Sequence, residues 1–335
     1  MSGGVVAKGL VKRFGNFEAL KGVDFEVPEG SLVALLGPNG AGKTTAIRIF
    51  TTLILPDEGS ATVGGYDCVR EAQLVRSSIG LTGQYAAVDE DLSGRENLVL
   101  VGRLCRMSKS AAHARAVDLL DLFQLSDAAD RPLRTYSGGM RRRLDLSASL
   151  MFAPPVLFLD EPTTGLDPRS RLDLWDVIVE LKERGTTIVL TTQYLEEADQ
   201  LAERISVIDV GTIIAEGTAD ELKDRVGGDM LDLTLHDRAD TAAAVSLLQR
   251  TFKVAEKDIA IDNDLGRVQV PAPQGALALV EAVRVLDAQN LRVADLGLRR
   301  PSLDDVFLSL TGHAAEDEGR PEAPEPGRGR RGMGV

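Results

Sequence analysis

Residues 37–45 read GPNGAGKTT and follow directly on the apolar run 32–36, which reads LVALL. A glycine-rich loop between a buried strand and a helix can bend so that successive backbone N–H groups converge on a phosphate. Lys43 can reach the terminal phosphates of a nucleotide, and the hydroxyl of Thr44 can bind Mg2+. The sequence therefore predicts a nucleoside triphosphate site with these candidate residues: Gly37, Pro38, Asn39, Gly40, Ala41, Gly42, Lys43, Thr44 and Thr45.

Length, charge and cysteine content narrow the class of protein. A chain of 335 residues is too long for one ordinary hydrophobic core, and 44% of its residues are apolar, so we expect two domains and a tail. A net charge of −13 argues against nucleic acid as a direct partner. No run reaches the roughly 18 apolar residues of a membrane span, so we expect membrane contact only through a partner. Two cysteines without metal-ligand spacing favour a reducing cytosol and argue against zinc.

Residues 1–226 read as an α/β unit with a helical insertion at about 86–153. Turn signals between short apolar runs at 5–27 predict a small antiparallel sheet. A capping box at Ser93 and Glu96 predicts the start of a helix within the insertion, and Thr218 with Glu221 forms another. Further strands are expected at 61–63, 79–82, 156–159 and 187–191, and a helix at 168–184. Two buried helix faces are expected, one formed by Ala46, Ile47, Phe50, Leu53 and Ile54, the other by Leu195, Ala198, Leu201, Ala202 and Ile205.

The sequence predicts a smaller accessory domain at residues 227–312 and a disordered tail at residues 313–335. The tail is rich in Pro, Gly, Glu and Arg and has almost nothing to bury. The domain reads as strand, helix, two strands, helix and strand, which is the order of an α+β ferredoxin-like module. Its elements are expected at 230–235, 241–252, 258–261, 267–270, 276–289 and 291–296.

Two adjacent acids end the apolar strand VLFLD at 156–160. Asp160 comes at the carboxyl end of this strand, beside the phosphate loop, where it can hold Mg2+ through water. Glu161 projects differently and can orient or deprotonate an attacking water. This pair predicts hydrolysis of the bound nucleotide.

YSGGM at 136–140 precedes a helical pattern, so Ser137 can cap the helix and the glycines leave its N–H groups open to phosphate. GPNGAGKTT, Gln84, YSGGM (usually LSGGQ), VLFLDE and GLD at 165–167 occur in the order of the ATP-binding cassette (ABC) family, which the chain resembles over residues 5–225. The resemblance implies a P-loop NTPase ABC nucleotide-binding domain with an antiparallel β subdomain and a helical insertion.

The same resemblance assigns roles to residues outside the phosphate loop. In the family, ATP lies between two cassettes, which places Ser137, Gly138 and Gly139 on the nucleotide of the partner copy. Asp167 joins the nucleotide-binding set, and Gln84 would contact Mg2+ and the attacking water. Phe14 matches the aromatic residue that stacks on adenine, although a core phenylalanine is the alternative.

Gln193 departs from the family pattern, which usually has histidine at this switch position after a strand. Its amide can donate a hydrogen bond to the γ-phosphate but cannot carry a proton at neutral pH. Glu161 and Gln193 are therefore the two catalytic candidates, with hydrolysis resting mainly on Glu161. The run Arg141–Arg143 points in three directions on a helix, so we expect solvated side chains or contacts with a partner subunit.

Longer stretches, among them TYSGGMRRRLDL at 135–146 and SLDDVFLSLTGH at 302–313, resemble the ATP-binding subunits of daunorubicin/doxorubicin-resistance exporters. This implies a peripheral protein at the cytoplasmic face of the cell membrane that uses ATP and Mg2+, pairs with a second copy and with a separate transmembrane permease, and powers antibiotic efflux. Two alternatives stay open, a soluble cassette ATPase in translation or DNA maintenance and a nucleotide-binding regulatory protein. A single phosphate loop and the intact Lys43, Asp160 and Glu161 argue against them.

Overall fold

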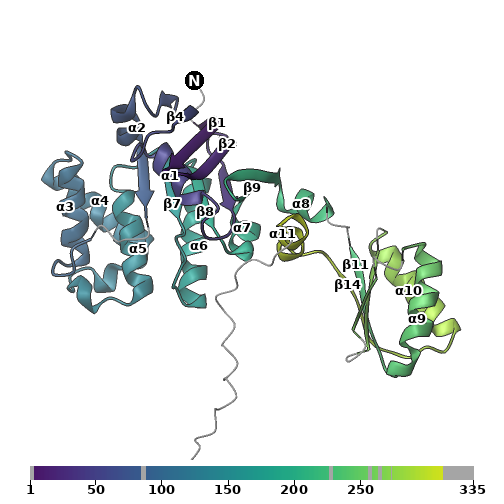
Figure 1. The fold of residues 1–335 in the computed structure, drawn as a ribbon. Coiled ribbons are helices and arrows are strands. Elements are labelled where there is room, and N and C mark those ends of the chain that lie inside the picture. The colour runs from purple at the N-terminus through teal and green to yellow at the C-terminus, as the bar shows by residue number, and fades with distance from the viewer. Residues whose placement is uncertain are drawn as a thin grey trace, which may run out of the picture.

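The computed structural model describes residues 4–83, 88–225, 229–255, 259–262, 266–272 and 274–311. In these ranges the strands form a 4-stranded sheet β2-β1-β4-β5, a 6-stranded sheet β10-β9-β3-β8-β7-β6 and a second 4-stranded sheet β12-β13-β11-β14 (Figure 1). No helix within them is long and apolar enough to cross a membrane. The α/β class predicted from the sequence is confirmed.

The described residues form the following strands and α-helices, in chain order. The strands are β1 (Val5–Phe14), β2 (Phe17–Val27), β3 (Leu32–Leu36), β4 (Glu58–Val63), β5 (Tyr66–Asp67), β6 (Ile79–Thr82), β7 (Val156–Asp160), β8 (Thr187–Thr192), β9 (Arg204–Asp209), β10 (Thr212–Gly217), β11 (Met230–Leu235), β12 (Ala260–Asp262), β13 (Arg267–Pro271) and β14 (Val293–Arg299). The α-helices are α1 (Lys43–Phe50), α2 (Ala72–Ser78), α3 (Gly94–Leu104), α4 (Lys109–Leu122), α5 (Gly138–Ser149), α6 (Pro168–Glu183), α7 (Leu195–Leu201), α8 (Ala219–Arg225), α9 (Thr241–Phe252), α10 (Ala276–Ala288) and α11 (Leu303–Thr311).

The central sheet places the predicted site at one edge. Strand β8 pairs in parallel with both β3 and β7, so the ends of all three strands point the same way. Every residue of these strands is buried, and β7 sends Val156 and Phe158 into one core and Leu157 and Leu159 into another. Burial on both faces explains why the strands read as continuous apolar runs. The loops that follow β3, β7 and β8 therefore lie side by side.

The antiparallel sheet predicted at the start of the chain is present, with β1 paired to β2 and β4. The capping box at Ser93 and Glu96 is confirmed as the start of α3. Leu53, expected on the buried face of α1, is 62% exposed, because the helix ends at Phe50 and Thr52 turns the chain with a φ of 62°.

The helical pattern predicted after β8 is wrong at its end. Helix α7 stops at Leu201, and Ile205 lies instead in β9 opposite Ala34 of β3. Strands β9 and β10 form an antiparallel pair that the sequence did not indicate. Pairing with the central sheet decides the conformation of this segment, and Ile205 is fully buried in that pairing.

The third sheet carries α9 and α10 on one face, and their apolar residues form a separate core with β11 and β13 (Figure 1). The predicted order of strands and helices is present, with β11 antiparallel to both β13 and β14. Assignment of this unit to the ferredoxin-like fold stays a prediction.

The last described helix, α11, packs away from the third sheet. Leu303, Val306 and Phe307 are buried in a cluster with Leu195 of α7 and Leu222 of α8. Residues 303–311 lie within the range 227–312 expected for the accessory domain, yet their apolar face completes the core of the first unit. The chain therefore leaves the first unit after α8 and returns to it at α11.

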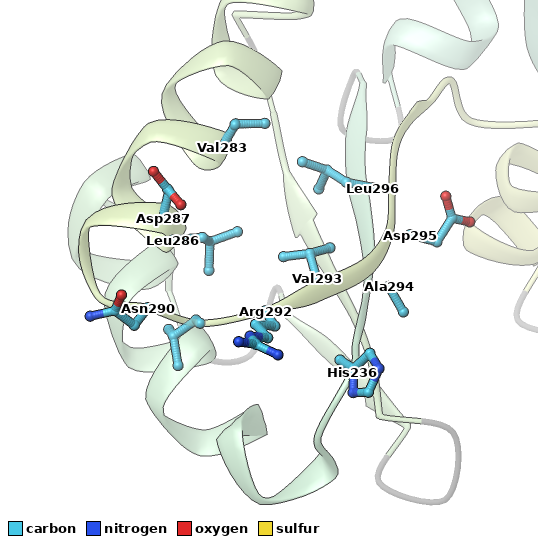
Figure 2. Close-up of a pocket in the computed structure, with 11 residues that line it drawn as sticks. His236, Val283, Leu286, Asp287, Asn290, Arg292, Val293, Ala294, Asp295 and Leu296 are labelled. Atoms are coloured by element: carbon cyan, nitrogen blue, oxygen red, sulfur yellow. The ribbon is translucent and has the colours of Figure 1, made fainter.

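A cavity of about 810 Å³ lies between the end of α10 and strand β14 (Figure 2). Its wall combines the apolar side chains Leu286 and Val293 with charges of both signs, including Asp287 and Arg292. Because it lies at the third sheet, it is separate from the phosphate loop.

Candidate functional site

Of the nine predicted residues, 37–42 join β3 to α1, and Lys43, Thr44 and Thr45 form the first turn of the helix. Gly42 has a φ of 112°, and a Cβ on it would lie 2.7 Å from the carbonyl oxygen of Ala19, so only glycine fits this turn. The Lys43 ammonium is 3% exposed and donates to the carbonyl oxygens of Gly37 (2.8 Å) and Pro38 (3.1 Å). The loop thus holds a buried cation at its centre, which is the arrangement that an incoming phosphate requires.

Asp160 ends β7 directly opposite the phosphate loop. The Thr191 hydroxyl donates to its Oδ1 at 2.6 Å, and the Thr44 hydroxyl donates to the same oxygen at 3.3 Å. Thr191 is fully buried in β8, which lies between β7, ending in Asp160, and β3, whose phosphate loop leads to Thr44 in α1. The strand order therefore explains the meeting of Thr44, Asp160 and Thr191, which lie far apart in sequence.

Glu161 turns sharply out of the strand. Its φ of 49° lies in the left-handed region, and its N–H donates to the backbone oxygen (3.1 Å) and the hydroxyl (3.2 Å) of Thr191. This turn brings Oε1 of Glu161 to 3.2 Å from Lys43 Nζ, and the two side chains are only 8% and 3% exposed. The structure thus joins the predicted phosphate-binding cation and the predicted base in one ion pair.

The signature residues lie at the start of α5. The Ser137 hydroxyl accepts from the Met140 N–H, which is the predicted cap, and both Ser137 and Gly138 are exposed. Gly139 is buried against α6, where an added Cβ would lie 2.4 Å from the Ser170 hydroxyl oxygen. Asp167 caps α6 by accepting from the Ser170 N–H at 3.0 Å. The motif and the α6 cap therefore pack together.

Three further predicted residues have different outcomes. Phe14 is 49% exposed, so the core alternative is wrong, and Lys12 Nζ lies over its ring at 5.6 Å from the ring centre. Gln193 follows β8, is 6% exposed and has an Oε1 without a hydrogen-bond partner in the described part of the chain. Gln84 lies outside the described residues.

The expectation of a solvated arginine run is wrong at Arg142. Its side chain is 13% exposed and donates to the carbonyl oxygens of Gly83, Glu161 and Pro162. Arg141 does pair at the surface, with Glu90 at 2.7 Å. The sequence carried one signal for the difference, since Arg142 shares a helix face with the buried Asp145 three residues on. Thr191 was also missed, because a threonine in a buried strand has no distinguishing pattern.

The oxygen atoms at this edge fit a magnesium ion. Mg2+ prefers hard oxygen ligands and usually binds proteins through one or two side chains, with water and phosphate oxygens completing its shell. The Thr44 hydroxyl and the Asp160 carboxylate supply such a pair. No group of three or more His, Cys, Asp or Glu side chains that could hold a metal occurs in the described ranges, so the pair would need phosphate oxygens to complete a site.

Residues 20–164 match the sequence signature of a family described as ABC transporter. The chain is 53% identical over 319 residues to the daunorubicin resistance ATP-binding protein DrrA2 of Streptomyces coeruleorubidus, which covers 95% of this chain and 98% of that protein. It therefore belongs to the ABC transporter family, as an ATP-binding cassette ATPase.

Within this family the chain is similar to the drug-resistance ATP-binding proteins. It is 50% identical over 327 residues to the daunorubicin/doxorubicin resistance ATP-binding protein DrrA of Streptomyces peucetius, covering 96% of each chain. The fold matches the dimeric post-hydrolysis structure of the ATP-binding cassette MJ0796, bound to ADP and phosphate. That match has a TM-score of 0.58 and 27% identity, and covers 64% of this chain and 98% of the other.

Proposed function

We propose that this chain is the ATP-hydrolysing subunit of a drug exporter, and that it works as a pair of cassettes bound to a separate transmembrane permease. The convergence of Lys43, Asp160 and Glu161 at one sheet edge carries the hydrolytic part of the proposal. The similarity to proteins named for daunorubicin and doxorubicin resistance supports an amphipathic antibiotic as the cargo. Both alternatives drawn from the sequence are less favoured by these relatives.

The loop binds the triphosphate through its backbone N–H groups and Lys43. Because Lys43 already pairs with Glu161, an entering phosphate competes for the ammonium and frees the carboxylate. Glu161 then orients the attacking water and accepts its proton. Thr44, Asp160 and Gln84 would hold Mg2+, which would supply positive charge to neutralise the phosphate oxygens.

A second copy completes the nucleotide site. Ser137 and Gly138 are exposed at the start of a helix, where uncovered N–H groups favour an anion. We assign these residues, with Gly139 and Asp167, to the nucleotide bound by the partner copy. The dimeric ADP-bound cassette supports this arrangement. Pairing through bound ATP then makes an isolated copy nearly inactive.

The permease holds the pair at the cytoplasmic face of the membrane and conducts the drug. Residues 1–226 form the nucleotide-binding domain in this proposal, with the helical subdomain at about 86–153. The accessory domain falls within residues 227–312, except that α11 at its end packs on the nucleotide-binding domain, and 313–335 form the tail.

Gln193 acts on the γ-phosphate in place of histidine. Gln193 is buried directly after β8, where its amide N–H can donate to a phosphate oxygen and its Oε1, unpartnered in the described residues, can accept from water. A glutamine does not titrate, so turnover should show no histidine-like step between about pH 6 and 7. Normal turnover in Gln193→Ala would remove this residue from the mechanism.

Glu161→Gln tests the central claim. The amide cannot accept the proton, so the variant should bind ATP, stop hydrolysing it and accumulate as a dimer in gel filtration when Mg-ATP is added. The double variant Glu161→Gln with Lys43→Ala is the control, since the loss of the buried cation should abolish both binding and dimer. Rapid hydrolysis by Glu161→Gln would contradict the assigned base.

Export is tested by co-expression with the membrane protein encoded beside this chain. Co-purification and stimulation of ATPase activity by doxorubicin support the transporter assignment. Failure to associate with a membrane protein, together with full ATPase activity, would favour a soluble cassette ATPase.

A further inference from the structure

Arg142 connects two parts of the cassette through a single side chain. It leaves the second turn of α5, five residues after Ser137, and reaches the loop that follows β7. There Nε donates to Pro162 O at 2.7 Å, while Nη2 donates to Glu161 O at 3.1 Å and to Asp160 O at 3.3 Å. Nη1 donates to Gly83 O at 2.6 Å. One guanidinium therefore holds four backbone carbonyl groups.

These carbonyl groups belong to the turn that aims the proposed base. Glu161 has a left-handed φ of 49°, which a non-glycine residue keeps only when its surroundings enforce it. Thr191 holds the N–H side of this residue, and Arg142 holds its carbonyl side. The side chain of Glu161 is thus directed to Lys43 by restraints on both of its peptide groups.

We propose that Arg142 is a positioning residue for hydrolysis, which sets the backbone of Glu161 and thereby the place of its carboxylate. The inference rests on the proposed role of Glu161 as the base. Arg142 also holds the carbonyl group of Gly83, the residue before Gln84, at the end of β6. It therefore ties the helix that begins with the signature residues to both segments that are assigned to the attacking water.

The geometry requires a guanidinium and not merely a positive charge. Arginine presents five N–H donors in a fixed planar fork, whereas lysine presents three donors on one nitrogen atom. An ammonium at this place could not span the carbonyl groups of Gly83 and Pro162 together. Asp145, at 3.7 Å, provides the nearby negative charge that a buried cation needs, and it would serve a lysine as well.

A coupling between copies follows from this connection. In the proposed dimer the start of α5 lies against the nucleotide of the partner. A shift of α5 on closure of the dimer moves Arg142, and with it the turn at Glu161 in the same chain. Engagement of one nucleotide thus adjusts the base that acts on the other.

The test compares Arg142→Gln and Arg142→Lys with the control Arg141→Gln, which removes a surface ion pair from the same helix. The full chain is assayed for ATP hydrolysis at protein concentrations at which it dimerises. We expect kcat to fall about 10-fold or more in both Arg142 variants, a change that corresponds to about 1.4 kcal/mol. We expect the KM for ATP to change less than about 3-fold, since the hydrogen bonds of Arg142 in the described residues go to backbone carbonyl groups outside the phosphate loop. Arg141→Gln should keep the kcat of the parent.

Each variant is also made in the Glu161→Gln background, and ATP-dependent dimerisation is measured by gel filtration. Dimer formation by Arg142→Gln in that background shows that folding and nucleotide binding survive. Recovery of kcat by Arg142→Lys would overturn the proposal, because charge alone would then suffice. An unchanged kcat in Arg142→Gln would also overturn it. Loss of both the dimer and kcat in the two Arg142 variants would overturn it as well. Continued hydrolysis by Glu161→Gln itself would instead refute the proposed base and leave the Arg142 contacts to serve the fold alone.

Discussion

Thr191→Val removes one hydroxyl from the centre of the site and leaves the shape of the side chain almost unchanged. In the parent, this hydroxyl donates to Asp160 Oδ1 at 2.6 Å and accepts from the N–H of Glu161 at 3.2 Å. Thr191 is fully buried, so no water can replace the lost donor without a rearrangement of β8. Valine suits a strand as well as threonine does, and the effect should come from the polar contact.

The size of the effect follows from the charge on the acceptor. A hydrogen bond to a charged group contributes about 1.5–3 kcal/mol, and an acceptor left buried without its partner keeps its desolvation cost. Glu161 keeps a second acceptor, the backbone oxygen of Thr191 at 3.1 Å, so its share of the loss is small. We expect the free energy of unfolding to fall by about 2 kcal/mol, and the melting temperature by about 4–8 °C for a unit of this size.

Thr187→Val is the matched control in the same strand. The Thr187 hydroxyl accepts from the Gly30 N–H at 2.9 Å, a bond between neutral groups, and the residue is 1% exposed. Its loss should cost about 1 kcal/mol. Thermal unfolding without nucleotide, followed by circular dichroism, compares the two variants, and the Mg2+ concentration for half-maximal ATPase activity should rise only in Thr191→Val. Equal melting temperatures and equal Mg2+ dependence in the two variants would refute the role given to Thr191.

Three further variants or modifications probe other parts of the fold. Gly139→Ala should lower the melting temperature, because the added Cβ would lie 2.4 Å from a hydroxyl oxygen on α6. In Gly138→Ala the added Cβ meets nothing within 4 Å, so this variant should keep its melting temperature and lose only the ATP-dependent dimer in gel filtration. Burial raises the pKa of the Cys68 thiol to about 12, so a thiol reagent at neutral pH should label Cys105 in the folded chain and Cys68 only after unfolding, as mass spectrometry would show. Burial also raises the pKa of Glu197, so the folded chain keeps this carboxyl protonated at pH values at which the unfolded chain ionises it. The free energy of unfolding should therefore fall as pH rises from the ordinary carboxyl pKa through the raised one. Because glutamine does not titrate, melting curves should show the melting temperature of Glu197→Gln rising relative to that of the parent over this range.

Elements that depend on contacts between residues close in sequence could be predicted from the sequence. The capping box at Ser93 is a contact between residues three apart, and it is present in the structure. The phosphate loop and the strand ending at Asp160 are likewise each read from a run of consecutive residues. By contrast, β9 was missed because Ile205 fits the helical spacing of the preceding residues, and only its pairing with β3 makes it a strand.

The ion pair between Lys43 and Glu161 could not be predicted from the sequence, since it depends on the order of strands and on a backbone angle. Strand β8 had to lie between β3 and β7 for Thr191 to reach Asp160 and hold the turn at Glu161. The run of three arginines shows the same limit, because Arg141 and Arg142 are chemically identical neighbours. One pairs at the surface and the other is buried among carbonyl groups; Asp145 is the one sequence signal for this difference, and the loop that packs against α5 decides it. Residue type thus predicts which chemistry a site can perform, while contacts between distant segments decide which copy of that residue performs it.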